Sequence, residues 1–179
     1  MIDWNVIVTV KEYTFEEACL YMERFGPVKS TDYYNVLAMQ VEDPSEFAEV
    51  LREDLEDKPD VQPLLSHVIP VTRKVKFETP AEFEASVREV LEDWATDLAG
   101  KSFHVRVHRR GFKSKMSSVE EEERLGSMVF EILEEAGAAC EVEFGDPDAV
   151  VAVEILDNEA GLSLWTREDL KRYPFLGLD

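Results

Sequence analysis

Residues 101–111 read KSFHVRVHRRG, and the pattern of this segment decides how the second half of the chain folds. Three apolar residues alternate with two histidines and an arginine, which is the two-residue period of a strand with one buried face. The apolar positions are Phe103, Val105 and Val107. The segment therefore predicts a strand with a core side and a cationic side, followed by a loop at Gly111.

Helices are expected on both sides of this strand in the sequence. Thr79 begins a capping box with Pro at the next position, and apolar residues at helical spacing follow until Gly100. A second capping box begins at Ser118 and leads a helix to Gly137. Three further strands are expected at residues 140–144, 150–155 and 162–165. We therefore expect a second α+β domain from about residue 78 to the end.

The first 72 residues alternate between strand and helix periods. Strands are expected at residues 2–8, 34–41 and 68–71, and helices begin at the caps Thr14 and Asp43. The order β-α-β-α-β indicates a small sheet with helices on one face, as in ferredoxin-like folds. Residues 73–77 are interpreted as an extended connector.

Composition limits the classes of function. The 179 residues include 39 Asp plus Glu and 19 Lys plus Arg, for a formal net charge of −20. A uniformly acidic surface repels a polyanion, so the chain is not a general nucleic-acid coat. No stretch approaches the roughly 20 apolar residues that span a bilayer, so we expect a cytoplasmic protein without membrane contact. The lone Cys19 and Cys140 suit a reducing compartment and are interpreted as buried hydrophobic residues.

A search for catalytic and metal-binding motifs finds none. The three histidines and two isolated cysteines form no Cys-x-x-Cys pair and no His-Glu-x-x-His helix. His104 and His108 would lie about 13 Å apart on a strand, too far to share an ion. No glycine-rich phosphate loop and no nucleophile elbow is present. We therefore expect no catalytic residues, no metal site, no cofactor and no enzyme activity.

The basic segment 101–115 is the candidate binding site. It holds six Lys or Arg and no acid. Arginine and lysine side chains donate to phosphates, an aromatic ring can stack on a base, and glycine lets a loop approach its ligand. The predicted RNA-binding residues are Lys101, Arg106, Arg109, Arg110, Phe112, Lys113 and Lys115. The alternative is a basic strand that is merely neutralised by the surrounding acids.

The second half resembles a THUMP domain, the RNA-binding module of several tRNA-modifying enzymes. The resemblance rests on residues 100–111, on the helix at 118–136, and on the strand, Pro-Asp turn and strand at 140–155. It implies an α+β chain in which an N-terminal ferredoxin-like domain at 1–77 precedes a THUMP-like α/β RNA-binding domain at 78–179. Because no methyltransferase, deaminase or sulfur-transfer domain is recognised, the chain resembles the stand-alone members of the family.

The stand-alone members imply a specific role for the chain. They act as non-catalytic tRNA-binding adaptors for an RNA cytidine acetyltransferase, which makes acetylcytidine in tRNA. The resemblance implies recognition of tRNA by shape and backbone near its acceptor end. Two other classes remain open: a protein-protein interaction module with a THUMP-like fold and little RNA affinity, and a ferredoxin-like regulatory domain that binds a small metabolite.

Overall fold

Contacts divide the chain into two compact units in the computed structural model, which describes residues 2–112 and 115–178. The first unit comprises the residues up to Thr72 together with Leu170–Gly177, and the second comprises Arg73–Asp169. These units differ from the expected domains at 1–77 and 78–179 in two places. The segment after Thr72 joins the second sheet, and a short C-terminal segment returns to the first unit. Each unit combines a sheet with helices, which confirms the α+β class.

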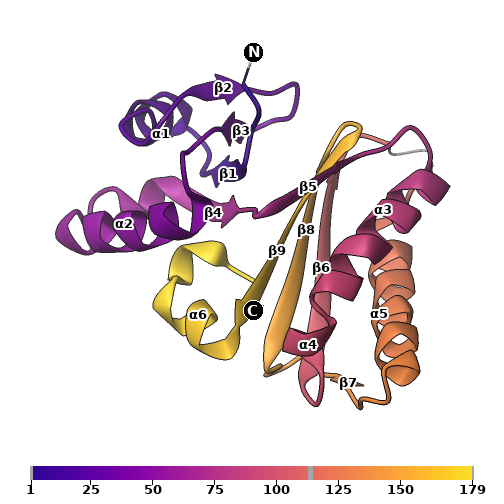
Figure 1. Ribbon diagram of the computed structural model, residues 1–179. Coiled ribbons are helices and arrows are strands. Elements are labelled where there is room, and N and C mark those ends of the chain that lie inside the picture. The colour runs from indigo at the N-terminus through magenta and orange to yellow at the C-terminus, as the bar shows by residue number, and fades with distance from the viewer. Residues whose placement is uncertain (1, 113–114, 179) are drawn as a thin grey trace. The chain divides into compact units, whose positions relative to one another are not determined.

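The first unit is a four-stranded antiparallel sheet in the order β2-β3-β1-β4, with α1 and α2 on one side of it (Figure 1). Its elements are β1 (Val6–Val10), α1 (Phe15–Met22), β2 (Val28–Ser30), β3 (Val36–Met39), α2 (Pro44–Asp57), η1 (Gln62–Leu64) and β4 (Leu65–Pro70). The β-α-β-β-α-β order confirms the ferredoxin-like arrangement. It adds the short strand β2, which the sequence did not predict.

The two helix starts of this unit are made differently. The Asp43 carboxylate accepts hydrogen bonds from the backbone N–H groups of Ser45 and Glu46, as its predicted capping role requires. Thr14 has no side-chain cap bond to its helix. Its hydroxyl instead donates to the carbonyl of Lys11 at 2.7 Å. The predicted cap at Asp43 is confirmed, and Thr14 is the residue before α1 as predicted, although its side chain does not cap the helix.

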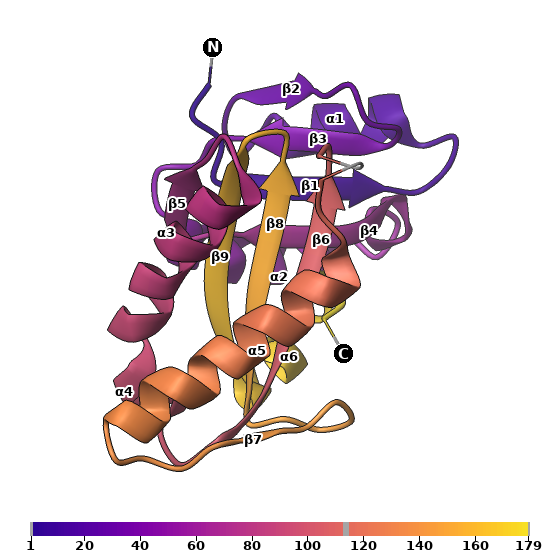
Figure 2. The same cartoon turned by 90° about the vertical axis from the view of Figure 1, so that its right-hand side faces the viewer.

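The second unit is a five-stranded mixed sheet in the order β5-β9-β8-β6-β7. Its elements are β5 (Arg73–Lys76), α3 (Pro80–Asp93), α4 (Ala95–Leu98), β6 (Ser102–Arg110), α5 (Ser118–Glu135), β7 (Glu141–Val142), β8 (Ala149–Leu156) and β9 (Glu159–Thr166). Strand β6 is parallel to both of its neighbours, whereas the other pairs are antiparallel. Helices α3 and α5 lie on the same face of the sheet (Figures 1 and 2).

The core of the second unit forms where α3 and α5 pack on the sheet. Each element contributes a fully buried side chain to this core: Phe83 from α3, Leu125 from α5 and Phe103 from β6. The Thr79 hydroxyl caps α3, as predicted, whereas α5 is capped by the Ser117 hydroxyl and not by the predicted Ser118, which is the first residue of the helix. The single helix expected up to Gly100 is two helices, because α3 ends at Asp93 and the short α4 follows.

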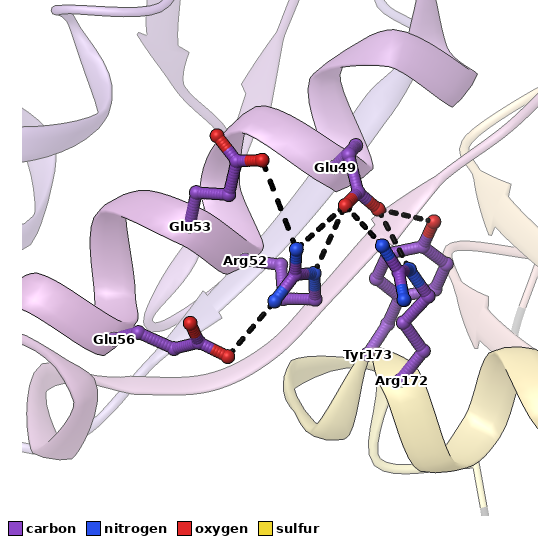
Figure 3. Close-up of polar contacts among 6 residues, drawn as sticks. All are labelled: Glu49, Arg52, Glu53, Glu56, Arg172 and Tyr173. Atoms are coloured by element: carbon purple, nitrogen blue, oxygen red, sulfur yellow. Dashed lines mark hydrogen bonds and ion pairs between the residues drawn. The ribbon is translucent and has the colours of Figure 1, made fainter.

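Two short helices complete the chain. They are α6 (Arg167–Arg172) and η2 (Pro174–Leu176). Within the first unit, the carboxylate of Glu49 on α2 accepts from the Arg172 guanidinium at 2.9 and 2.5 Å and from the Tyr173 hydroxyl at 2.9 Å (Figure 3). Phe175 and Leu176, which follow Tyr173 closely in the sequence, are buried. The C-terminal segment is therefore held by both polar and apolar side chains.

Candidate nucleic-acid interface

Strand β6 carries the predicted site, and its alternation is observed. Phe103, Val105 and Val107 are buried, with exposed fractions of 4% or less, and belong to the core beneath α3 and α5. The intervening side chains of His104 and Arg106 are half-buried. The two faces predicted for this strand are therefore confirmed.

The start of β6 is fixed by the Pro-Asp turn that precedes β8. The Ser102 N–H donates to an Asp148 carboxylate oxygen at 2.9 Å, and the Asp148 N–H donates to the Ser102 hydroxyl at 2.9 Å. The Ser102 backbone donor, with help from Arg167, lowers the pKa of Asp148. This reciprocal pair sets the parallel register in which Phe103 lies opposite Ala149. The turn thus acts as a structural clamp.

Arg110 is engaged inside the unit. Its guanidinium donates to the Glu154 carboxylate on β8 at 3.0 Å, and the Nδ1 atom of His108 lies 2.6 Å from the other oxygen of the same carboxylate. Glu154 is only 1% exposed, so its negative charge depends on these partners. The structure therefore gives Arg110 a role in compensating a buried acid, in addition to the phosphate contact predicted for it.

Arg109 closes the turn after β6. Its Nη1 atom donates to the Gly111 carbonyl at 2.7 Å, across a glycine with φ of 97°. Its Nε atom is buried without a hydrogen-bond partner among the described residues. The Nη1 group of Arg109 is therefore engaged by the protein itself, and fewer of its N–H donors are available to a ligand than the sequence indicates.

Phe112 lies in the basic loop, and its ring packs against the core of the second unit. Its ring centroid is 5.1 Å from that of Phe77, in contact with the core. The Lys115 ammonium lies 5.5 Å from the centre of the Phe112 ring, within cation-π range. Lys113, predicted to bind RNA, lies outside the described residues. Phe112 thus holds the loop on the core, and the base-stacking role remains a prediction.

Lys101 and Arg106 present their charges differently. Lys101 is exposed at the N-terminal end of β6 and Arg106 is half-buried in the middle of the strand. Burial, followed by the nearby Arg106 charge, lowers the pKa of His104, so this histidine adds no positive charge near neutral pH. The described members of the predicted set therefore do not form one cluster of open cations.

Further cations lie on β5, the opposite edge strand of the same sheet, which the sequence indicated only as a connector. Arg73 forms an ion pair with Asp93 at 2.8 Å, and Lys74 pairs with Glu159 at 3.0 Å. Lys76 is exposed. Three of the four residues of β5 are Lys or Arg, which gives no sign of a strand. The segment becomes a strand by pairing with β9, which lies more than 80 residues away in the sequence.

The structure also bears on metal sites and membrane spans. Within residues 2–112 and 115–178, no three His, Cys, Asp or Glu side chains gather as metal ligands. None of the helices described is long and apolar enough to cross a bilayer.

Comparison with known proteins gives a consistent set of relatives. Residues 78–164 match the model of the THUMP domain family. A tRNA sulfurtransferase of Haemophilus influenzae (strain 86-028NP) is 29% identical over 154 residues, which cover 86% of this chain and 28% of that protein. The chain thus spans little more than a quarter of the length of this relative.

Solved structures show the same fold. PH1313 from Pyrococcus horikoshii Ot3 aligns with a TM-score of 0.57 at 16% identity, over 90% of this chain and 54% of that one. TrmN from Thermus thermophilus aligns with a TM-score of 0.51 at 19% identity, over 89% of this chain and 44% of that one. A 4-thiouridine synthetase in complex with RNA and ATP has a TM-score of 0.50 at 20% identity, over 90% of this chain and 41% of that one.

Proposed function

We propose that this chain, whose residues 78–164 match the THUMP domain family, binds tRNA and presents it to a modification enzyme without catalysing a reaction itself. The observation that carries the proposal is the coverage of the sulfurtransferase match, which extends over 86% of this chain and therefore takes in most of both compact units. The relative acts on tRNA by its name. A shared pair of units supports a shared RNA-binding role.

Cations before, within and after β6 support the same proposal. Lys101 and Lys115 are exposed, and Arg106 is half-exposed between them in the sequence. Cations of this kind bind phosphates in any sequence context, whereas a catalytic site would need further groups. We propose that these residues, together with Lys113, supply most of the phosphate contacts and that Arg109 and Arg110 contribute less.

The partner enzyme in this proposal is an RNA cytidine acetyltransferase, on the resemblance to the stand-alone THUMP proteins. This chain would then hold the tRNA while the enzyme forms acetylcytidine. Incubation of the chain with tRNA and acetyl-coenzyme A, followed by nucleoside mass spectrometry, tests the division of labour. A modified nucleoside that appears without a second protein would contradict the adaptor role.

The central test is binding of total tRNA at low salt, measured by filter retention. The variant Lys101→Ala/Lys115→Ala should bind more weakly, because it loses two exposed phosphate donors. Lys29→Ala is the matched control, since Lys29 is an exposed lysine of the first unit on β2. Equal affinities for all three proteins would remove the basic segment from the interface. No tRNA binding by the unmodified chain would leave the protein-interaction role as the better proposal.

A further inference from the structure

A groove of about 620 Å³ lies within the second unit, between β6, α5 and the segment around β7. Its floor includes Val105 and Val107 of β6. Large apolar side chains with exposed fractions of 39–69% line it. They are Val119 and Phe130 of α5, and Val142 and Phe144 in and after β7. Four of the eight exposed large hydrophobic residues found in the described chain therefore gather in one place, as binding surfaces do.

The groove runs along an incompletely paired edge of the sheet. Strand β7 pairs with β6 only at Ser102 and Phe103, where the Glu143 N–H donates to the Phe103 carbonyl at 3.0 Å. Backbone groups alternate in direction along a strand, so the N–H and C=O groups of Val105 and Val107 face the same side as those of Phe103. Beyond Phe103, no strand of the described residues covers that side.

A side chain occupies part of this edge. The Glu122 carboxylate, from α5, lies near the backbone N–H of Val107, and this neighbour opposes the rise that burial causes in the pKa of Glu122. This contact independently places the Val107 N–H on the groove side of β6. A carbonyl oxygen of an added strand would take the place of this carboxylate oxygen.

Gly126 leaves space in the wall of the groove. It lies in the interior of the 18-residue helix α5, on the same stripe as Val119, Glu122 and Phe130. Glycine is among the least favourable residues inside a helix. A Cβ atom at this position would meet no atom within 4 Å, so packing within the described chain does not require a glycine. An external occupant would account for it.

We propose that this groove binds an extended segment of a protein partner, which adds as a strand to the free edge of β6 and carries alternating apolar and basic side chains. Its basic side chains would face α5 and reach Glu122 and Glu123, and its apolar side chains would lie on the opposite face of the sheet, where Phe144 packs beside His104. Strand addition to a sheet edge is a common mode of peptide recognition. The proposal goes beyond tRNA binding and does not depend on it.

Charge favours a protein segment over RNA as the occupant. Glu122 and Glu123 line the groove, and Arg106 is its only Lys or Arg among the described lining residues. Glu141 and Glu143 lie in and beside β7. Phosphates would be repelled by these carboxylates, whereas lysine and arginine side chains would be attracted. The net charge of −20 favours a basic partner in the same way.

The direct test uses a synthetic peptide of about eight residues that alternates valine and lysine, which matches the length of the exposed edge. It is titrated into the full chain while backbone amide signals are followed by NMR. Binding should shift signals of β6, α5 and β7. A peptide with glutamate in place of lysine, and one methylated at alternate backbone nitrogens, should bind at least about tenfold more weakly.

The variant Gly126→Leu fills the groove without loss of helix propensity. It should abolish peptide binding while its thermal midpoint stays equal to or above that of the parent, so unfolding cannot explain the loss. Glu134→Leu, an exposed change on the same helix outside the groove, is the control. Absence of peptide binding, or equal binding by the parent and Gly126→Leu, would overturn the proposal. So would an RNA oligonucleotide that shifts the signals of Phe130 and Phe144 in place of the peptide.

The two proposals can fail separately, because the peptide titration contains no RNA. Gly126→Leu should keep the tRNA affinity of the parent, since Gly126 is not among the proposed phosphate contacts. A chain that binds the peptide but no tRNA would support the groove and reject the adaptor role.

Discussion

Glu121 shows how a single buried acid makes stability depend on pH. It is 2% exposed at the start of α5, and one of its carboxylate oxygens has no hydrogen-bond partner among the described residues. Burial, followed by the neighbouring Glu84 charge, raises the pKa of Glu121 from 4.5 to about 7, although Arg124 opposes this. The folded chain therefore binds this proton more tightly than the unfolded chain does.

The sign of the pH effect follows from that difference. The contribution of Glu121 to stability is greatest below pH 4.5 and is lost as the pH rises to about 7. We expect Glu121→Gln to remove this decline and to raise the free energy of unfolding at pH 8 by up to about 3 kcal/mol. Urea unfolding at several pH values measures it, with the exposed neighbour Glu120→Gln as control. An unchanged decline in Glu121→Gln would refute the assignment.

Arg110 gives a second prediction at this scale. Its replacement by alanine removes a partner from the Glu154 carboxylate, which is 1% exposed. An uncompensated buried charge is costly, so Arg110→Ala should lower the free energy of unfolding by about 3 kcal/mol. The double variant Arg110→Ala/Glu154→Gln should recover part of that loss, because the charge is gone. If the two changes are additive in urea unfolding, the side chains are not coupled.

The C-terminal segment is an element whose attachment combines an exposed ion pair with buried apolar side chains. The Arg172 side chain is 53% exposed where it contacts Glu49 (Figure 3). Leu176 is fully buried. Exposed ion pairs contribute little to stability, because water screens them and the side chains lose freedom, whereas burial of a leucine contributes far more.

The two kinds of contact can be separated by mutation. Arg172→Ala should leave the urea midpoint almost unchanged, while Leu176→Ala should lower the free energy of unfolding by about 2–5 kcal/mol. Both values come from the same equilibrium unfolding experiment. A loss for Arg172→Ala that equals the loss for Leu176→Ala would show that the polar contacts hold the segment.

Elements with local signals could be predicted from the sequence, and those defined by distant partners could not. The predicted caps at Asp43 and Thr79 lie next to the helices that they begin, and the predicted cap Ser118 lies one residue after the observed cap Ser117. Strand β2 has only three residues and little burial, so it shows no alternation. Strand β5 carries three cations in four residues, and it becomes a strand through pairing with β9.

The same distinction applies to the candidate site. The two faces of β6 follow from alternation within the strand. The carboxylate that engages Arg110 lies 44 residues further along the chain, and its proximity depends on the parallel register of β6 and β8. The groove likewise needs α5, β6 and β7 to be placed together. Positive charge could be located in the sequence, but its availability to a ligand could not.

At the scale of the whole molecule, local attraction and overall repulsion compete in RNA binding. The formal net charge of −20 repels a polyanion over distances of about a Debye length, and added salt screens that repulsion. Contacts between lysine or arginine and phosphates have the opposite salt dependence, because they release counterions. A binder of this composition must therefore rely on a short-range basic surface, and the exposed part of residues 101–115 is the strongest candidate.

Salt titration of tRNA affinity measures this competition. If about four cations contact phosphates, the logarithm of the affinity should fall against the logarithm of salt concentration with a slope of roughly −3 to −4, made shallower by the screened repulsion. Lys101→Ala/Lys115→Ala should flatten the slope by somewhat under two units, because two contacts are lost. Lys29→Ala should keep the slope of the parent. A slope shared by all three proteins would mean that the phosphate contacts lie elsewhere on the chain, and the cations of β5 would be the next to test.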